Sequence, residues 1–385
     1  MHDSYRNLVY GIALALMIGW VLYLGRGIIV PVVASILIVY IILGLARLLA
    51  RLPVIGPHVP APLRYLASIL VIGVVVSAVV SLLITNINQV VAIAPQYQER
   101  LLGLIQQGAE AVGVETEPTW ETIRRDVFGQ IDIQSLIGST VGWVSSIVGV
   151  FLLVLVYAGF LLAEHTAFES KIGRLSRDPE QVMRIREIIA DINGRIGTYL
   201  ALKTFINAVL GVISYAIMAL IGIEFAGFWA ALIALLNYIP YLGSFLGVTF
   251  PVALSLLQFG DYGMTFIVLA ALASAQIFVG NFLEPMLLGS SLNLSPFVIL
   301  VSLVSWYTLW GVAGALLAVP ITAIIVIIFS QFDGTRPIAI LLSKDGQVTP
   351  PPSRTGWSPA APVAAHLTDA NADGGRPLHV PARVP

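Results

Sequence analysis

The chain has 385 residues, of which 58% are hydrophobic and 11% are charged; its formal net charge is −1 and its mean hydropathy is +0.91. Soluble domains carry about 25% charged residues, so this composition predicts an all-α integral membrane protein. The near-zero net charge gives no sign of nucleic-acid binding. The absence of cysteine excludes disulfides, thiol catalysis and cysteine-ligated metal.

Catalytic and metal-binding patterns are also missing. A Gly-x-Ser-x-Gly elbow, a Walker phosphate loop and an HExxH pair do not occur. No pair with the spacing of a zinc site is formed by the five histidines, His2, His58, His165, His366 and His379. We therefore expect no enzyme, no metal and no cofactor.

Three apolar runs long enough to cross a bilayer occupy the N-terminal part, residues 1–85. They are residues 8–24, 28–46 and 65–85. The first run has a poorly basic flank and no small-residue cleavage site, and a second apolar run follows at once, which disfavours a signal peptide. We predict spans 1 to 3 here.

Two polar regions flank the fourth apolar run, residues 141–163. Residues 86–140 hold seven acidic and three basic residues, with apolar positions at helical spacing, which predicts amphipathic helices. Residues 164–200 form a strongly charged region rich in lysine and arginine. Because basic residues near span ends favour the cytoplasm, we expect 86–140 outside, 164–200 inside and both termini cytoplasmic.

Four long apolar segments, 198–223, 225–257, 265–282 and 295–329, predict a C-terminal membrane core at residues 201–332. One crossing each gives about eight spans. The second and fourth are too long for a simple crossing, since about 33 helical residues measure about 50 Å. Both contain Gly and Pro, so discontinuous or re-entrant helices are expected, and either one crossing or a re-entrant path fits. Residues 333–385 are predicted to be a disordered cytoplasmic tail.

The first interruption is the stretch NYIPYLG, residues 237–243. Pro240 lacks an amide hydrogen and crowds the preceding turn, and Gly243 allows unusual backbone angles. Broken helices of this kind form solute and ion sites in secondary transporters, and Asn237 adds a donor and an acceptor. The alternative is a proline kink used only for packing.

The second interruption is WYTLWGVAGALLAVPIT, residues 306–322. Gly311 and Gly314 are one helical turn apart, and Pro320 closes the run. These small residues indicate either a close approach of two helices or a second gate of one pathway.

Polar residues lie between the two interruptions and before the first. Asn281 and Glu284 share a helix face, and Glu284 either accepts a proton or cation or lies at the interface where Pro285 ends the helix. Lys203 and Asn207, at the start of the fifth span, are expected to snorkel or to line a cytoplasmic entrance.

Three motifs in this order resemble the autoinducer-2 exporter family, also described as PerM-like permeases. They are Asn237-x-Ile-Pro240-x-x-Gly243, Glu284-Pro285-x-x-x-Gly289, and Leu309-Trp-Gly311-x-x-Gly314 continuing to Pro320. The resemblance covers about residues 8–332 and implies about eight spans and a homo-oligomer. It also implies that these motif residues form the functional core. The family pattern often places Gln or Glu shortly before the Glu-Pro pair, where this chain has Asn281.

The leading hypothesis is a multi-pass secondary transporter of a prokaryotic inner membrane. It exports a small polar solute, an autoinducer-2-like signal or related metabolite, with Glu284 as the proton or cation group. One alternative is a sodium or lithium/proton antiporter, and another is a membrane scaffold that transports nothing. The expected partners are the lipid bilayer, the solute, protons or sodium, and further copies of the chain.

Overall fold

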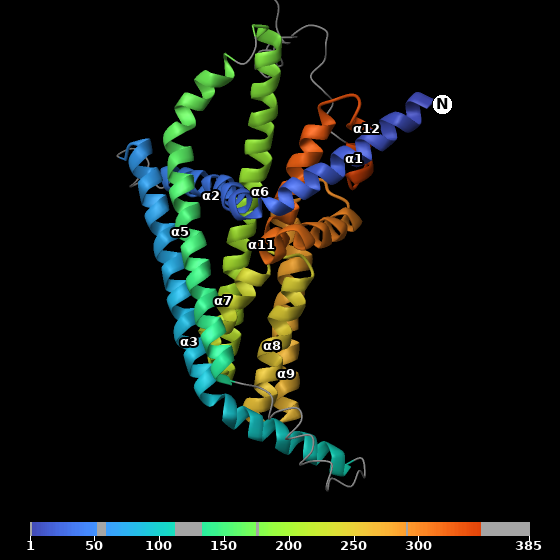
Figure 1. Ribbon diagram of the computed structural model, residues 1–385. Coiled ribbons are helices and arrows are strands. Elements are labelled where there is room, and N and C mark those ends of the chain that lie inside the picture. Colours follow the sequence, from blue (N-terminus) through green and yellow to red (C-terminus); the bar gives the residue numbers. More distant parts are fainter. Residues whose placement is uncertain (1, 52–58, 112–132, 175–176, 290–291, 348–385) are drawn as a thin grey trace, which may run out of the picture.

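The computed structural model describes residues 2–51, 59–111, 133–174, 177–289 and 292–347, and this part of the chain folds into helices (Figure 1). The apolar composition favours helices, because a helix satisfies its own backbone groups within lipid. The elements are α1 (His2–Leu24), α2 (Arg26–Arg51), α3 (Ala61–Ala111), α5 (Ile133–Ile172), α6 (Pro179–Ile221), α7 (Ala226–Leu236), α8 (Leu242–Phe259), α9 (Tyr262–Phe278), the π-helical segment η2 (Val279–Leu283), α10 (Glu284–Leu288), α11 (Pro296–Ser330) and α12 (Arg336–Leu342).

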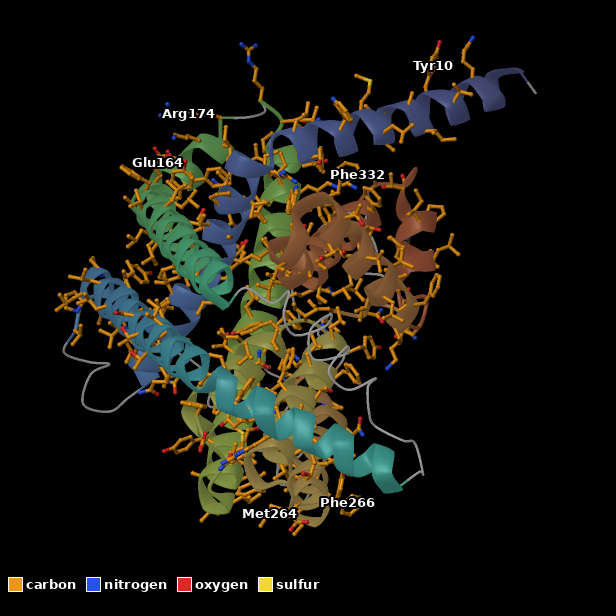
Figure 2. All side chains as sticks on the ribbon, turned by 60° about the horizontal axis from the view of Figure 1, so that its bottom comes forward. Tyr10, Glu164, Arg174, Met264, Phe266 and Phe332 are labelled. Atoms are coloured by element: carbon orange, nitrogen blue, oxygen red, sulfur yellow. The ribbon has the colours of Figure 1, made fainter. Side chains whose placement is uncertain are left out.

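The chain is a helical membrane protein, as predicted. Within the described ranges, six stretches are long and apolar enough to cross a bilayer: Arg26–Ala46, Pro62–Asn86, Pro179–Ile221, Leu242–Phe259, Tyr262–Leu288 and Pro296–Ser330. The predicted first and fourth spans correspond to shorter apolar stretches, Val9–Leu24 and Gly149–Glu164. Figure 2 shows Glu164 and Arg174 at one end of the molecule and Met264 and Phe266 at the other.

Helix α3 joins a span to the first polar region without a break. It has 51 residues, and at about 1.5 Å per residue it is far longer than the lipid core. The helix continues beyond its apolar stretch, and Figure 1 shows this polar extension turning beneath α7, α8 and α9. Residues 112–132 of the predicted amphipathic region lie outside the described part.

Helices α7 and α8 form a hairpin, so the first interrupted segment is re-entrant. α7 ends at Leu236 and α8 begins at Leu242, and the far ends of both lie at the bottom of Figure 1. Pro240 fits the connection because it has no amide hydrogen to leave unpaired. Tyr241 turns the chain with a φ of 62°. The predicted interruption is confirmed.

Gly243 has a different role from the one predicted. The positive φ of this turn belongs to Tyr241, and Gly243 already lies in the first turn of α8. A β-carbon on Gly243 would lie 1.9 Å from the carbonyl oxygen of Leu236, which is shorter than any real contact. Glycine is needed here for close approach of the backbone, not for unusual backbone angles.

Helix α11 also folds back on itself. Gly311 interrupts it with φ 64° and ψ −143°, a conformation that glycine adopts at little cost. A β-carbon on Gly314 would lie 1.9 Å from the carbonyl oxygen of Trp306, and the indole Nε1 of Trp306 donates to Thr322 Oγ1 at 3.2 Å across the fold. Pro320, the last proline of this motif, does not end the helix: it is buried inside the second half of a helix that continues to Ser330.

Helix α6 is the centre of the packing. Its C-terminal half joins α7, α8 and α9 in one apolar cluster that includes Ile206, Leu210, Met218, Ala230, Ile233, Leu254 and Leu272. Its N-terminal half joins α2 and α11 in a second cluster that includes Ile196, Tyr199, Leu200, Leu37, Val319 and Ala323. α6 therefore holds both folded-back segments.

The ordered structure extends beyond residue 332, where the sequence predicts a disordered tail. Helix α12 packs with α11, and its Ala339 is fully buried in the second cluster. The chain after α12 then pairs with the segment before α11: the amide of Ser295 donates to Leu342 O at 3.1 Å, and that of Lys344 donates to Asn293 O at 3.1 Å. The predicted boundary is wrong for 333–347, and 348–385 lie outside the described residues.

Candidate functional site

A polar stripe on α6 lies in the interior of the protein. The side chains of Lys203 and Asn207 are buried, with 4% and 2% of each residue exposed. The buried positions of α6 recur every three or four residues, at 196, 199, 200, 203, 206, 207 and 210, and both polar residues fall within this series. Their burial disfavours snorkelling, and the prediction that they line a cytoplasmic entrance stays a prediction.

Lys203 forms an ion pair with Glu284. Its Nζ lies 2.7 Å from Glu284 Oε1, and the pair joins α6 to α10 across 81 positions of sequence. The lysine side chain is 5% exposed and the glutamate side chain 29% exposed, so the carboxylate lies on the more accessible side. Charges at bilayer depth are costly, and pairing offsets part of that cost.

A π-helical turn places Glu284. Pro285 cannot donate a hydrogen bond and its ring crowds the carbonyl four residues earlier. The helix widens over η2 instead of ending, and the amide of Glu284 donates to Val279 O, five residues before it. The helix ends four residues later than predicted, at Leu288, where Gly289 takes a φ of 51°. Single π turns occur often at functional sites.

The tip of the α7–α8 hairpin binds the same stripe of α6. Asn237 Nδ2 donates to Asn207 Oδ1 at 2.8 Å, and the Tyr238 hydroxyl donates to Thr204 Oγ1 at 2.8 Å. Ser244 Oγ donates a longer bond of 3.4 Å to Asn237 Oδ1. One helix face therefore holds both the hairpin tip and, through Lys203, the carboxylate of α10.

The hairpin tip also meets α11. Buried Ile239 clusters with Leu303 and Ala315, which lie on either side of the turn at Gly311. The indole Nε1 of Trp310, next to that turn, donates to Leu22 O at the end of α1, at 2.9 Å. The two folded-back segments are thus packed against each other near their turns.

A cavity of about 920 Å³ lies beside the ion pair, within the range of small-molecule sites. Its wall combines residues of α6, the hairpin tip and α8, α9 to α10, and the segments before α11 and after α12. Among the described residues, the charged side chains in this wall are Lys203, Glu284 and Lys344. Polar groups are provided by Tyr199, Asn237, Tyr241, Ser244, Thr249, Gln276, Asn281 and Asn293.

Most predicted site residues gather at this cavity. Its lining includes Lys203, Asn237, Pro240, Asn281, Glu284, Pro285 and Gly289. Asn207 lies behind the wall, where it bonds Asn237. Gly243, Gly311, Gly314 and Pro320 do not line it: the first three shape the two turns, and Pro320 packs inside α11.

Sequence reasoning missed several residues of the wall. Tyr199 lies one turn before Lys203 in the buried stripe, which is a signal that could have found it. Gln276, a polar residue within the apolar stretch of α9, also lines the wall, and its buried Nε2 has no hydrogen-bond partner among the described residues. Lys344 had no signal at all. No group of three His, Cys, Asp or Glu side chains close enough to hold a metal ion occurs within the described ranges.

The polar extension of α3 clamps the base of the hairpin. The Tyr97 hydroxyl donates a short bond to Glu224, just before α7, and Arg100 Nη1 donates to Gln258 O at 2.8 Å, near the end of α8. Gln258 joins the two ends of the hairpin, because its Nε2 donates to Gly222 O at 2.8 Å and its Oε1 accepts from the Glu224 amide at 2.9 Å.

Comparison with known proteins decides the family. The model of the AI-2E family transporters matches residues 12–334. The chain belongs to this family. Its membership makes the protein a multi-pass membrane transporter, in keeping with the apolar helices.

Three relatives illustrate the similarity. The AI-2 transport protein TqsA of Escherichia coli is 29% identical over 86% of this chain and 96% of its own length. A putative transport protein of Borreliella burgdorferi is 34% identical over 52% of this chain and 55% of its own length. The putative transport protein YhhT of Escherichia coli is 27% identical over 74% of this chain and 80% of its own length.

Proposed function

We propose that this AI-2E family transporter exports a small polar solute, of the kind of AI-2 or a related metabolite, through the cavity beside Lys203 and Glu284. The main observation in support of this proposal is the ion pair in the cavity wall. A buried charge pair facing a cavity gives polar groups of a solute both an acceptor and a donor. The name of TqsA supports AI-2 as the first solute to test.

The hairpin tip supplies the second part of the proposed site. Asn237 and Ser244 line the cavity, and Asn237 is oriented by Asn207. Fixed amides and hydroxyls can replace water around a polar solute, which lowers the cost of moving it through lipid. We assign Asn237, Asn281 and Glu284 to solute binding, and Pro240, Gly243, Pro285, Gly289, Gly311 and Gly314 to shaping the backbone around it.

The orientation in the inner membrane is part of the proposal. The charged ends of α5 and α6 lie at the opposite end of the bundle from the polar extension of α3 (Figure 1). Basic residues concentrate near the α5 and α6 ends, which supports a cytoplasmic position for them and for both termini.

The antiporter alternative receives less support from the site. A sodium or lithium ion at Glu284 would compete with an ammonium group that already lies 2.7 Å from the carboxylate. The structure therefore favours solute export over sodium or lithium exchange.

The test is efflux of labelled AI-2 from proteoliposomes that contain purified protein, with empty liposomes and a Gly194→Ala protein as controls. A β-carbon on Gly194 meets no atom within 4 Å, so this variant preserves the site. We expect efflux from the parent, at least about tenfold slower efflux for Glu284→Gln and Asn237→Ala, and an unchanged rate for Gly194→Ala. Sodium-driven proton flux without AI-2 efflux would support the antiporter, and no flux of either kind would support a scaffold.

A further inference from the structure

The Lys203 ammonium occupies the position at which a carboxylate-dependent transporter would bind a free cation. It lies 2.7 Å from Glu284 Oε1, is attached to α6 and is almost fully removed from solvent. Lysine carries a compact single positive charge on a flexible chain, so it presents to the carboxylate the same charge as a sodium ion. The carboxylate thus already has a counter-ion that cannot diffuse away.

The surroundings of the pair provide oxygen atoms suited to a hard cation. Glu284 shares the cavity wall with Tyr199, Asn237 and Ser244, whose side chains carry oxygen atoms. Sodium sites in transporters are built from carboxylate, carbonyl and hydroxyl oxygens next to broken helices, which is the chemistry present here. With Lys203 in place, the ammonium satisfies the carboxylate, and Lys344 adds a second positive charge to the same wall.

We infer that Lys203 is a tethered counter-ion that replaces a bound monovalent metal ion, and that its removal uncovers a sodium- or lithium-binding site at Glu284. This inference rests on the proposed transport role of the cavity and specifies its coupling. By pairing with Glu284, Lys203 prevents sodium or lithium from binding at this carboxylate. Lys203 therefore determines the ion specificity of the site.

The experiment measures the thermal unfolding temperature of detergent-purified protein in sodium, lithium and choline chloride at equal ionic strength. It follows cation binding without solute flux, so its failure and the failure of the export proposal are distinguishable. For the parent we expect the same unfolding temperature in all three salts. For Lys203→Met we expect a rise of about 2 °C in sodium or lithium over choline, as one site at ten times its dissociation constant gives.

Two further variants make the result specific. Lys203→Met/Glu284→Gln should lose the response, because the carboxylate is gone. Lys344→Met removes a positive charge from the same wall but leaves the ion pair, and should show no response. The inference would be overturned if sodium and lithium leave the unfolding temperature of Lys203→Met unchanged. It would also be overturned if sodium raises the unfolding temperature of the parent and this rise disappears in Glu284→Gln. If Lys203→Met cannot be purified, the parent and its Glu284→Gln variant decide by this second criterion.

Discussion

Gly243 and the carbonyl oxygen of Leu236 face each other across the tip of the α7–α8 hairpin, with no room between them for a β-carbon. The contact fixes the turn in which Asn237 and Pro240 reach the cavity. We expect Gly243→Ala to cost about 3 kcal/mol of unfolding free energy, because backbone must move to admit the methyl group. Thermal unfolding checks this, with Gly194→Ala, an open helical site, as the matched control. Equal stability of the two variants would contradict the close approach.

The Lys203–Glu284 pair should show strong coupling. Removing one partner leaves the other charge in a mostly buried position, so Lys203→Met and Glu284→Gln should each cost about 2 kcal/mol, reduced from the fully buried value because Glu284 is partly accessible. The double variant should be more stable than either single one. The unfolding free energies of the parent, the two single variants and the double variant form a double-mutant cycle. If the two single effects add up to that of the double variant, the ion pair contributes nothing to stability.

Pro285 should control the position of Glu284. Alanine at this position restores an amide that can donate four residues back, so the π turn can relax to an α turn. Losing the extra residue rotates α10 by about 100° relative to α9 and separates Glu284 from Lys203. We expect Pro285→Ala to remain stable but to lose AI-2 efflux. Normal efflux would show that the π turn is not needed.

Helix α6 and the hairpin should move as one body, because Asn237 and Tyr238 bond its buried stripe. A β-carbon on Gly211 would lie 3.1 Å from that of Ala234, near disulfide geometry after a small adjustment. The chain has no cysteine, so a Gly211→Cys/Ala234→Cys protein can form only this bond within the chain. Its oxidation should change efflux by less than about twofold relative to the reduced protein. Loss of efflux on oxidation alone, with both single-cysteine proteins unaffected, would mean that the hairpin slides along α6.

The clamp at the hairpin base should persist at alkaline pH. Burial and the hydrogen bond to Glu224 raise the pKa of the Tyr97 phenol above the ordinary value of 10.0. Because the folded-state pKa is raised, this contribution to stability is complete below pH 10.0 and is lost as the pH rises through the folded value. Tyrosinate absorbance should show one late-titrating group fewer in Tyr97→Phe. The Tyr10→Phe protein, which alters an exposed residue on the projecting α1, is the control (Figure 2).

The helical architecture and both interruptions were predictable because apolar length, Pro and Gly act locally. The roles of Gly243 and Gly314 were not, because each turn brings back a backbone carbonyl from the preceding arm, that of Leu236 or Trp306, against the glycine. Pro285 illustrates the same limit: a missing amide is compatible with a helix end or with a wider turn, and packing around the ion pair selects the second.

Part of the site was readable and overlooked. The three-and-four spacing on α6 places Lys203 and Asn207 on the buried face, which indicates that both point toward the interior of the protein. Their partners could not be read in this way, because Glu284 and Asn237 lie 81 and 30 positions away. Lys344 was hidden for a different reason, since it follows the short helix α12, which lies beyond the last apolar segment and has no periodic pattern of its own.

The attachment of α12 has a consequence for comparing relatives. The segment shared with the family ends at residue 334, whereas the cavity wall also uses Lys344, which is held by the strand-like pairing with Asn293 and Ser295. The ion pair and the Asn237–Asn207 bond of the hairpin tip are formed by residues outside this segment. Chimaeras that swap residues 336–347 would therefore test whether this segment affects which solute a transporter of the family accepts.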